Sequence, residues 1–355
     1  PEVNSTRMMY TVWANNTGGS TNVNLNITIL EPSANIVYNP PNLILTRGQA
    51  MDPVVPEVDG GAIESWEIVP DLPDGLIFDN GTISGTPTVN MTLSTFLIYA
   101  NNSGGSALVG ISMTILEPAP TITYQTDYLI LTRGEEMSSA LHAIFGGGAV
   151  ASFNVEPELP DGLNFTNGTI FGTPTVNTSL VQYNITAINN GGSDYFLLNI
   201  TILEPVAILD VETNYFELTR SETEMNLTLN NTGGMVANWA VYPDLPDGLI
   251  LGNGTITGVP NVNSSLATYE IFANNSGGSA SILINIKILE PAANISYTTT
   301  QFTLTNGQDI FKVSPVLLGG NPVTWEFEPE LPDGITFSNG AVSYTHLTLP
   351  TNREV

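Results

Sequence analysis

The sequence predicts an all-β protein, built as a tandem array of β-sandwich modules that form an extended rod. One segment recurs three times in full and once in part, beginning at Leu72, Leu159, Leu245 and Leu331. Turn signals separate short runs of alternating apolar and polar residues roughly every eight to twelve residues, which is typical of antiparallel strands. No stretch has the periodicity of an amphipathic helix. Any function must therefore be sought in one module and in the joints between modules.

Ahead of the recurring leucine, each module has a glycine pair and then an aromatic residue. The glycine pairs predict turns and stand at positions 60–61, 147–148, 233–234 and 319–320. The aromatic residues are Trp66, Phe153, Trp239 and Trp325. The short runs around them alternate as strands do, so we expect one strand with a buried aromatic side chain.

After the leucine, each module reads Pro-Asp-Gly, a short apolar run and an Asn-Gly pair. The pairs are Asn80-Gly81, Asn167-Gly168, Asn253-Gly254 and Asn339-Gly340. Asn-Gly between two extended runs is the strongest local signal for a tight hairpin, because both residues tolerate a positive φ. Gly-Thr-Pro or Gly-Val-Pro follows in the complete copies, and proline has no amide hydrogen to give a strand partner. We expect the second strand to end there.

Each complete module closes with a longer hairpin whose strands alternate apolar residues onto one face. In the first complete module this face begins with Phe96, Ile98 and Ala100. The residues ahead of that module follow the same pattern, with Tyr10, Val12 and Ala14 and then Val23, Leu25, Ile27 and Ile29. Half-buried strands alternate in this way, so this face is predicted to form the core.

Every return strand ends in Leu-Glu-Pro, and the next module begins within a few residues. The junction glutamates are Glu31, Glu117, Glu204 and Glu290. A short linker stiffened by proline favours limited bending, which is why we expect a rod. The predicted organisation is a C-terminal hairpin of one repeat in 1–32, complete repeats in 33–118, 119–205 and 206–291, the N-terminal part of a repeat in 292–342, and a non-repeat tail in 343–355.

The run from LPDGL through NGTI to GTPT, followed by an alternating strand into ANNSGG, resembles the immunoglobulin-like repeats of bacterial and archaeal surface proteins, relatives of the cadherin-like and dystroglycan-like sandwiches. The resemblance covers essentially the whole chain up to Val342. It implies Greek-key sandwiches, an extracellular or cell-surface location, and a structural spacer or adhesive stalk without catalytic residues. The alternative is an extracellular module that binds carbohydrate or a protein partner, including one stiffened by calcium.

Charge and composition limit the classes of molecule that this chain is expected to bind. The chain has 34 acidic and 7 basic residues, a net charge of −27, which would repel nucleic acid and anionic lipid. No run approaches the roughly 18 apolar residues of a membrane-spanning helix, so we expect no direct membrane insertion in this segment. We expect partners among cell-surface or extracellular proteins or glycans. The two histidines and the absence of cysteine offer no catalytic constellation, so we predict no enzyme activity.

Calcium is the one cofactor that the sequence leaves open. Acidic residues flank each Leu-Pro and stand at the junctions, and their carboxylates are hard oxygen ligands. The candidate ligands are Asp71, Asp74, Glu117, Glu158, Asp161, Glu204, Asp244 and Asp247. The dense acidic runs of a cadherin junction or an EF-hand loop are missing, and Asp before Gly recurs in turns for a conformational reason. The favoured interpretation has these acids capping turns and maintaining solubility, with no cofactor.

Arginine is rare, yet it recurs in the sequence LTRG or LTRS, at Arg47, Arg133 and Arg220. An acidic partner on the same or an adjacent module is one interpretation. A solvated turn residue that balances local charge is the other, because exposed ion pairs contribute little stability.

Outward-facing aromatic residues are candidates for stacking on sugars, at Trp13, Tyr99 and Phe272. Because a binding platform needs several aromatics on one patch, packing on the strand surface is the favoured interpretation.

The two ends of the sequence depart from complete repeats. Residue 1 falls within a module, so we interpret the chain as an internal piece of a longer protein. After Ser343 the sequence YTHLTLPTNREV replaces the expected Gly-Thr-Pro and resembles a translated sequencing-adapter run. The hairpin in 1–32 and the strands in 292–342 are complementary halves of one sandwich, which suggests head-to-tail strand exchange between chains.

Overall fold

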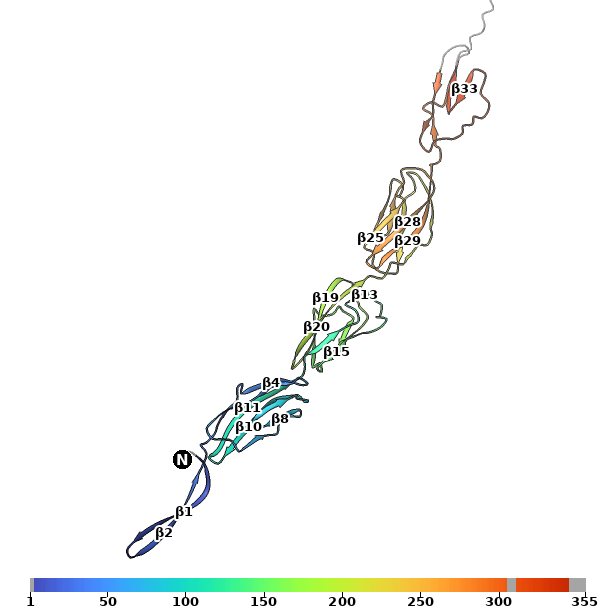
Figure 1. Cartoon of the computed structure of the whole chain (residues 1–355). Helices are drawn as coiled ribbons and strands as arrows, with labels where there is room; N and C mark the ends of the chain where they lie inside the picture. Colours follow the sequence, from blue (N-terminus) through green and yellow to red (C-terminus); the bar gives the residue numbers. More distant parts are fainter. Residues whose placement is uncertain (1–2, 305–310, 345–355) are drawn as a thin grey trace, which may run out of the picture. The chain divides into compact units, whose positions relative to one another are not determined.

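The computed structural model describes residues 3–304 and 311–344, and every regular element in this part of the chain is a β-strand (Figure 1). Within it, no helix is long and apolar enough to cross a membrane. Contacts divide the chain into two compact units, Pro1–Ile202 and Leu203–Val355. The all-β prediction is confirmed.

The first unit begins with a hairpin of β1 (Ser5–Asn16) and β2 (Gly19–Ile29). The strands pair antiparallel, with Tyr10 opposite Leu25 and Val12 opposite Val23. This hairpin is the one at the blue end of Figure 1. Its apolar face is exposed to solvent.

The first complete repeat follows and contains three groups of strands. The strands are β3 (Asn35–Val37), β4 (Asn42–Thr46), β5 (Met51–Val54), β6 (Glu57–Asp59), β7 (Ser65–Val69), β8 (Leu76–Asp79), β9 (Thr82–Gly85), β10 (Met91–Asn102) and β11 (Gly105–Leu116). One sheet has the order β4-β11-β10-β7, the second has the order β5-β9-β8, and β3 pairs with β6. β4 runs parallel to β11, and the chain crosses between sheets as a Greek-key sandwich requires.

The second repeat, also in the first unit, has the same design. Its strands are β12 (Pro120–Thr123), β13 (Tyr128–Thr132), β14 (Leu141–His142), β15 (Ile144–Gly147), β16 (Ser152–Glu156), β17 (Leu163–Thr166), β18 (Thr169–Gly172), β19 (Thr178–Asn189) and β20 (Gly192–Leu203). The sheets have the orders β13-β20-β19-β16 and β14-β18-β17, and β12 pairs with β15. The repeat in the sequence is therefore a repeat of topology.

The second unit contains the third complete repeat. Its strands are β21 (Leu209–Asp210), β22 (Tyr215–Thr219), β23 (Met225–Thr228), β24 (Asn230–Asn231), β25 (Asn238–Tyr242), β26 (Leu249–Gly252), β27 (Thr255–Gly258), β28 (Ser264–Asn275) and β29 (Gly278–Leu289). The sheets have the orders β22-β29-β28-β25 and β23-β27-β26, and β21 pairs with β24. β22 again runs parallel to the return strand, β29.

The second unit continues into a shorter set of strands. They are β30 (Ile295–Ser296), β31 (Phe311–Val313), β32 (Val316–Leu317), β33 (Ile335–Ser338) and β34 (Ala341–Tyr344). β31, β34 and β33 form one sheet, and β30 pairs with β32. β34 includes Ser343 and Tyr344, two residues beyond the boundary that the repeat pattern suggests, and the rest of the predicted tail lies outside the described residues.

Each complete repeat has its own core, which the long hairpin fills. In the first repeat Phe96, Ile98, Ile111, Met113 and Ile115 are at most 2% exposed. The counterparts are Tyr183, Ile185, Leu198, Ile200 and Ile202 in the second repeat and Tyr269, Ile271, Ile284, Ile286 and Ile288 in the third. Burying one such side chain contributes about 1.5–3 kcal/mol, so these hairpins account for much of the stability of each sandwich.

The local predictions hold at the Asn-Gly turns. Asn80 has a φ of 47° and Gly81 a φ of 80°, and the other three pairs have closely similar values. The recurring aromatic lies partly buried on β7, β16 and β25 in the complete repeats. Trp325 is also partly buried but lies outside a strand. In the first repeat Trp66 pairs with Ala100 of β10, and the described part of residues 292–344 includes no counterpart of β10.

Candidate functional site at the repeat junctions

The Leu-Glu-Pro junction of the first unit is held by the repeat that follows it. The amide nitrogen Nδ2 of Asn189 donates a hydrogen bond to the carbonyl of Pro118, over 2.8 Å. The backbone amide of Glu117 donates to Oδ1 of Asn190, over 3.0 Å. Asn189 is the last residue of β19 and Asn190 is the first residue of the turn to β20. We call this end of the hairpin, which binds the linker, the clamp.

Hydrogen bonds within the turn hold the side chain of Asn189 in position. Oδ1 of Asn189 accepts the backbone amides of Gly191 and Gly192, over 2.8 and 3.1 Å. Nδ2 of Asn189 also donates to the carbonyl of Ala149, beside the glycine pair of the same repeat. One side chain thus ties together the turn, the glycine pair and the linker.

The same clamp recurs at two other junctions, each within one unit. Asn102 donates to the carbonyl of Pro32 over 2.9 Å, and Asn275 donates to that of Pro205 over 2.7 Å. A serine hydroxyl replaces the second asparagine there, accepting from the backbone amide of Glu31 or Glu204. The recurrence shows that the clamp is a property of the repeat.

Glycine is required where the linker passes over these turns. A β-carbon added at Gly148 would overlap the carbonyl oxygen of Pro118, and one added at Gly191 would overlap that of Glu117. Gly61 and Gly104 meet Pro32 and Glu31 in the same way. The glycine pairs were predicted as turns, and the structure adds that they let the linker backbone approach closely.

The junction glutamate reaches back to the repeat that precedes it. The guanidinium of Arg47, in the turn after β4, binds Oε2 of Glu117 through Nη2 at 2.5 Å and Nε at 3.2 Å. This hydrogen bond and charge raise the pKa of Arg47 above its ordinary value. In the second unit, Arg220 and Glu290 form the equivalent pair at 2.6 Å. Of the two interpretations of the recurring arginine, the acidic partner is the correct one at these positions.

Glu117 therefore joins two repeats of the first unit: its side chain binds Arg47 in the first, and its backbone binds the second.

Glu204, at the corresponding junction of the second unit, is the most buried charged side chain among the described residues. Its Oε2 accepts the backbone amide of Met235, over 3.3 Å, beside the glycine pair of the third repeat.

The other candidate calcium ligands have a different environment. Asp71, Asp74, Glu158, Asp161, Asp244 and Asp247 are all exposed. In the Pro-Asp-Gly turn it is the backbone carbonyl of Asp74 that is used, as the acceptor for the amide of Thr88 over 2.9 Å. Across residues 3–304 and 311–344, no three His, Cys, Asp or Glu side chains come together as an ion would require.

The structure also places the other residues that the sequence singles out. His142 is exposed on β14, with Nδ1 3.1 Å from the hydroxyl of Thr169. Trp13 is exposed on β1, whereas Tyr99 and Phe272 are half-buried on β10 and β28 of different repeats. These aromatic side chains therefore do not form one patch within a repeat.

Sequence reasoning missed a set of tyrosine anchors. The hydroxyls of Tyr38, Tyr124 and Tyr297 donate to the carbonyls of Gly81, Gly168 and Gly340 in the Asn-Gly turns. Burial raises the pKa of Tyr124 to about 12 and raises that of Tyr38 as well. The signal was the repeated Ile-x-Tyr at the first strand, which the third repeat replaces with Leu209, Asp210 and Val211.

Two sheets joined by Greek-key connections, as in the repeats described above, are the architecture of an immunoglobulin-like sandwich. Residues 34–115 and residues 119–202 each match the family model described as "Putative Ig domain". These two repeats belong to that family, and residues 206–291 have the same strand order.

Several solved structures are similar to the chain. The I-band fragment I67–I69 from titin matches at 15% identity, covering 73% of this chain and 98% of that chain with a TM-score of 0.35. Drosophila N-cadherin EC1-4 matches at 13% identity, covering 78% and 82% with a TM-score of 0.26. The N-terminal eight Ig domains of Down Syndrome Cell Adhesion Molecule match at 15% identity, covering 96% and 54% with a TM-score of 0.24. No curated protein matches the chain.

Proposed function

We propose that this chain is a non-enzymatic segment of an extracellular or cell-surface protein, in which the repeats act as a spacer or adhesive stalk. The observation that carries the proposal is the junction of the first unit. Its linker is bound from one side by Arg47 and from the other by Asn189 and Asn190. A linker held on both sides restricts bending between neighbouring repeats, which is what a spacer needs.

The chemistry of the junction supports a mechanical role. Its hydrogen bonds use backbone groups that every repeat supplies, and its ion pair uses one arginine and one glutamate. Partners would then be surface or extracellular proteins or glycans, contacted by exposed strands and loops or by domains that the spacer projects.

Small-angle X-ray scattering of the purified chain tests the spacer. A compact chain of 355 residues would have a radius of gyration of about 20 Å. Each 12-residue strand of the long hairpins spans about 40 Å, so repeats joined end to end give a much larger value. We expect a radius of gyration at least 1.5 times that of the compact chain. A value near 20 Å would contradict a spacer.

A variant at the junction tests whether the contacts of the clamp determine the radius of gyration. Replacing both Asn189 and Glu117 by alanine should broaden the distribution of interatomic distances and lower the radius of gyration, because the linker loses a contact on each side. Asn177→Ala is the matched control, since Asn177 is exposed in the same repeat and away from the junction contacts. Equal scattering from the double variant and the control would show that the clamp does not set the geometry.

Surface location needs a separate measurement. Protease treatment of intact host cells should remove the repeats before a cytoplasmic marker is released. Protection of the repeats until the cells lyse would rule out a surface stalk.

A further inference from the structure

One recurring sequence lies outside both the core and the clamp: an asparagine followed, two residues later, by serine or threonine. It stands at the start of the long hairpin in each complete repeat, as Asn90-Met91-Thr92, Asn177-Thr178-Ser179 and Asn263-Ser264-Ser265. Asn4-Ser5-Thr6 has the same place ahead of the hairpin β1–β2. The middle residue and the choice of serine or threonine differ between copies, yet the asparagine and a hydroxyl are kept. Asn-x-Ser/Thr is the acceptor sequence of N-linked glycosylation.

The backbone holds this asparagine at a fixed place on the surface. Two residues ahead of it in the first repeat, the amide of Thr88 donates to the carbonyl of Asp74, over 2.9 Å, and the other two complete repeats have the equivalent bond. After the asparagine, the register of β10 with β11 shifts between Met91 and Ser94. β19 and β28 shift at the same place. The hydroxyl of the acceptor sequence therefore belongs to an irregular stretch, where the strand gives up little pairing when an enzyme binds it.

The groups that an enzyme must reach are accessible in all three complete repeats. The asparagines are exposed and form no side-chain hydrogen bond within residues 3–304 and 311–344, at Asn90, Asn177 and Asn263. The hydroxyl-bearing residues are exposed too, at Thr92, Ser179 and Ser265. Both parts of the acceptor sequence are thus available in the folded repeat.

Several other Asn-x-Ser/Thr sequences have groups that the fold already uses. Asn80-Gly81-Thr82 forms a tight turn, in which Asn80 has a φ of 47°. In Asn101-Asn102-Ser103, the serine hydroxyl accepts the backbone amide of Glu31 as part of the clamp. Asn199 on β20 donates from Nδ2 to a backbone carbonyl, over 3.2 Å. These asparagines are poorer acceptors than the one at the start of the long hairpin.

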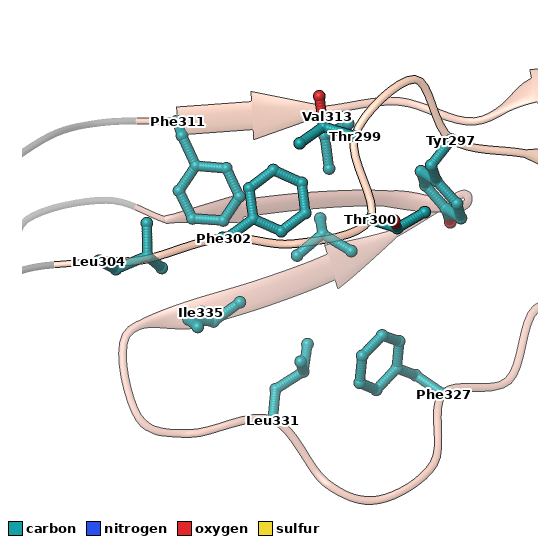
Figure 2. A pocket seen from close by; sticks show the side chains of 11 residues that line it. Tyr297, Thr299, Thr300, Phe302, Leu304, Phe311, Val313, Phe327, Leu331 and Ile335 are labelled. Carbon is teal, nitrogen blue, oxygen red and sulfur yellow. The ribbon is translucent and has the colours of Figure 1, made fainter.

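Exposed apolar side chains flank the acceptor asparagine in every complete repeat. Figure 2 shows apolar side chains of a different setting, which line a groove of about 420 Å³ among residues 297–342. Beside the asparagine they stand on open surface: the leucine three residues later is 54–72% exposed, and the valine directly before is 38–40% exposed. They are Leu93, Leu180 and Leu266, with Val89, Val176 and Val262. The apolar face of a sugar ring on the asparagine would remove part of this surface from water.

We propose that Asn90, Asn177 and Asn263 carry N-linked glycans. The inference rests on the surface location proposed above, since N-linked sugars belong to secreted and surface proteins. The donor is a lipid-linked oligosaccharide, and the enzyme is an oligosaccharyltransferase of the host. Nδ2 of the asparagine attacks C1 of the first sugar, and the bond from C1 to the lipid phosphate breaks, with its electron pair going to the phosphate. One proton of the carboxamide passes to a base of the enzyme.

Peptides that a protease releases from intact host cells test the inference by mass spectrometry. Their release measures surface location, and their mass measures glycosylation. We expect sugar on nearly all peptides with Asn90, Asn177 or Asn263 and on few with Asn80. Released peptides without sugar at those three positions would overturn the inference and leave the surface stalk standing. Sugar on a chain that is recovered only after lysis would contradict the stalk alone, and a sugar-free chain recovered only after lysis would contradict both.

Variants of the full chain test whether the modification follows the acceptor sequence. Thr92→Ala keeps Asn90 but removes the hydroxyl, so it should lose the sugar at Asn90 and keep the sugar at Asn177 and Asn263. Thr95→Ala is the matched control, because Thr95 is an exposed threonine on β10 outside the acceptor sequence. It should keep all three glycans. Sugar retained at Asn90 in Thr92→Ala would overturn the proposal.

Discussion

At the scale of single residues, the Asn-Gly turn is held from two directions. Asn and Gly supply the positive φ that the tight turn needs. The glycine also leaves room for the recurring aromatic, since a β-carbon on Gly81 would lie 2.8 Å from the ring of Trp66. In three of the repeats a tyrosine hydroxyl then binds the carbonyl of that glycine.

The tyrosine anchor gives a prediction for the second repeat. Tyr124→Phe removes the hydroxyl that donates a hydrogen bond, 2.9 Å long, to the buried carbonyl of Gly168. We expect a loss of about 1–2 kcal/mol in the free energy of opening, measured by hydrogen exchange in β17 and β18. Tyr128→Phe is the control, because Tyr128 is 61% exposed. Equal exchange in the two variants would show that the anchor contributes nothing.

Alkaline pH tests the same environment. Burial raises the pKa of Tyr124 from 10.0 to about 12, and it raises the pKa of Tyr183 in the same repeat. The folded state thus holds these phenol protons more tightly than the unfolded state does. The stability they contribute is fully present below about pH 10 and is lost as the pH rises through 12. Thermal melts between pH 9 and 12 should show this loss, and Tyr124→Phe should reduce its slope whereas Tyr128→Phe should not.

At the scale of elements, contacts with the linker account for the glycine pair and the Asn-rich turn of each repeat, which lie outside or at the ends of the strands. The glycine pair and the Asn-rich turn are far apart in the sequence, yet both face the Leu-Glu-Pro linker. In the third repeat, Asn275 donates to the carbonyls of Pro205 and Met235 and so joins the linker to the glycine pair at Gly233 and Gly234. The linker is therefore part of the folded repeat.

Gly234→Ala tests the close approach at this junction. The new methyl group would overlap the carbonyl of Pro205, so the linker must shift. We expect a destabilisation of about 1–3 kcal/mol for the third repeat, seen as a lower transition in calorimetry of the full chain. Gly252→Ala, at an exposed strand position with open space around it, should be neutral or stabilising by up to about 1 kcal/mol. A neutral Gly234→Ala would refute the packing argument.

At the scale of the whole molecule, the chain combines many acidic groups with few cations. Arg47, Arg220 and Lys287 each bind a glutamate, so part of the scarce positive charge is used to hold specific strands and linkers in place. Long-range repulsion among the remaining carboxylates is weakened by salt, whereas the core of each repeat is not affected. The extended rod stays a prediction for scattering to test.

Calcium binding is also a prediction to be tested at this scale. Glu117 is engaged by arginine, and the acidic residues around each Leu-Pro are exposed. We therefore expect the same melting temperature in calcium chloride and in chelator, provided that ionic strength is matched with sodium chloride. A rise of several degrees that is specific to calcium would contradict this and support the calcium-stiffened alternative.

The sequence by itself determined the all-β class, the repeat, the Asn-Gly hairpins and the apolar faces of the long strands. These features are encoded by neighbouring residues, through turn conformation and the two-residue period of a strand. Only the tertiary structure decided that Arg47 binds Glu117, that Asn189 binds the linker and that Tyr124 anchors a turn. Those partners are separated by tens of residues, and no local pattern states which distant groups the folded sheets bring within hydrogen-bonding distance.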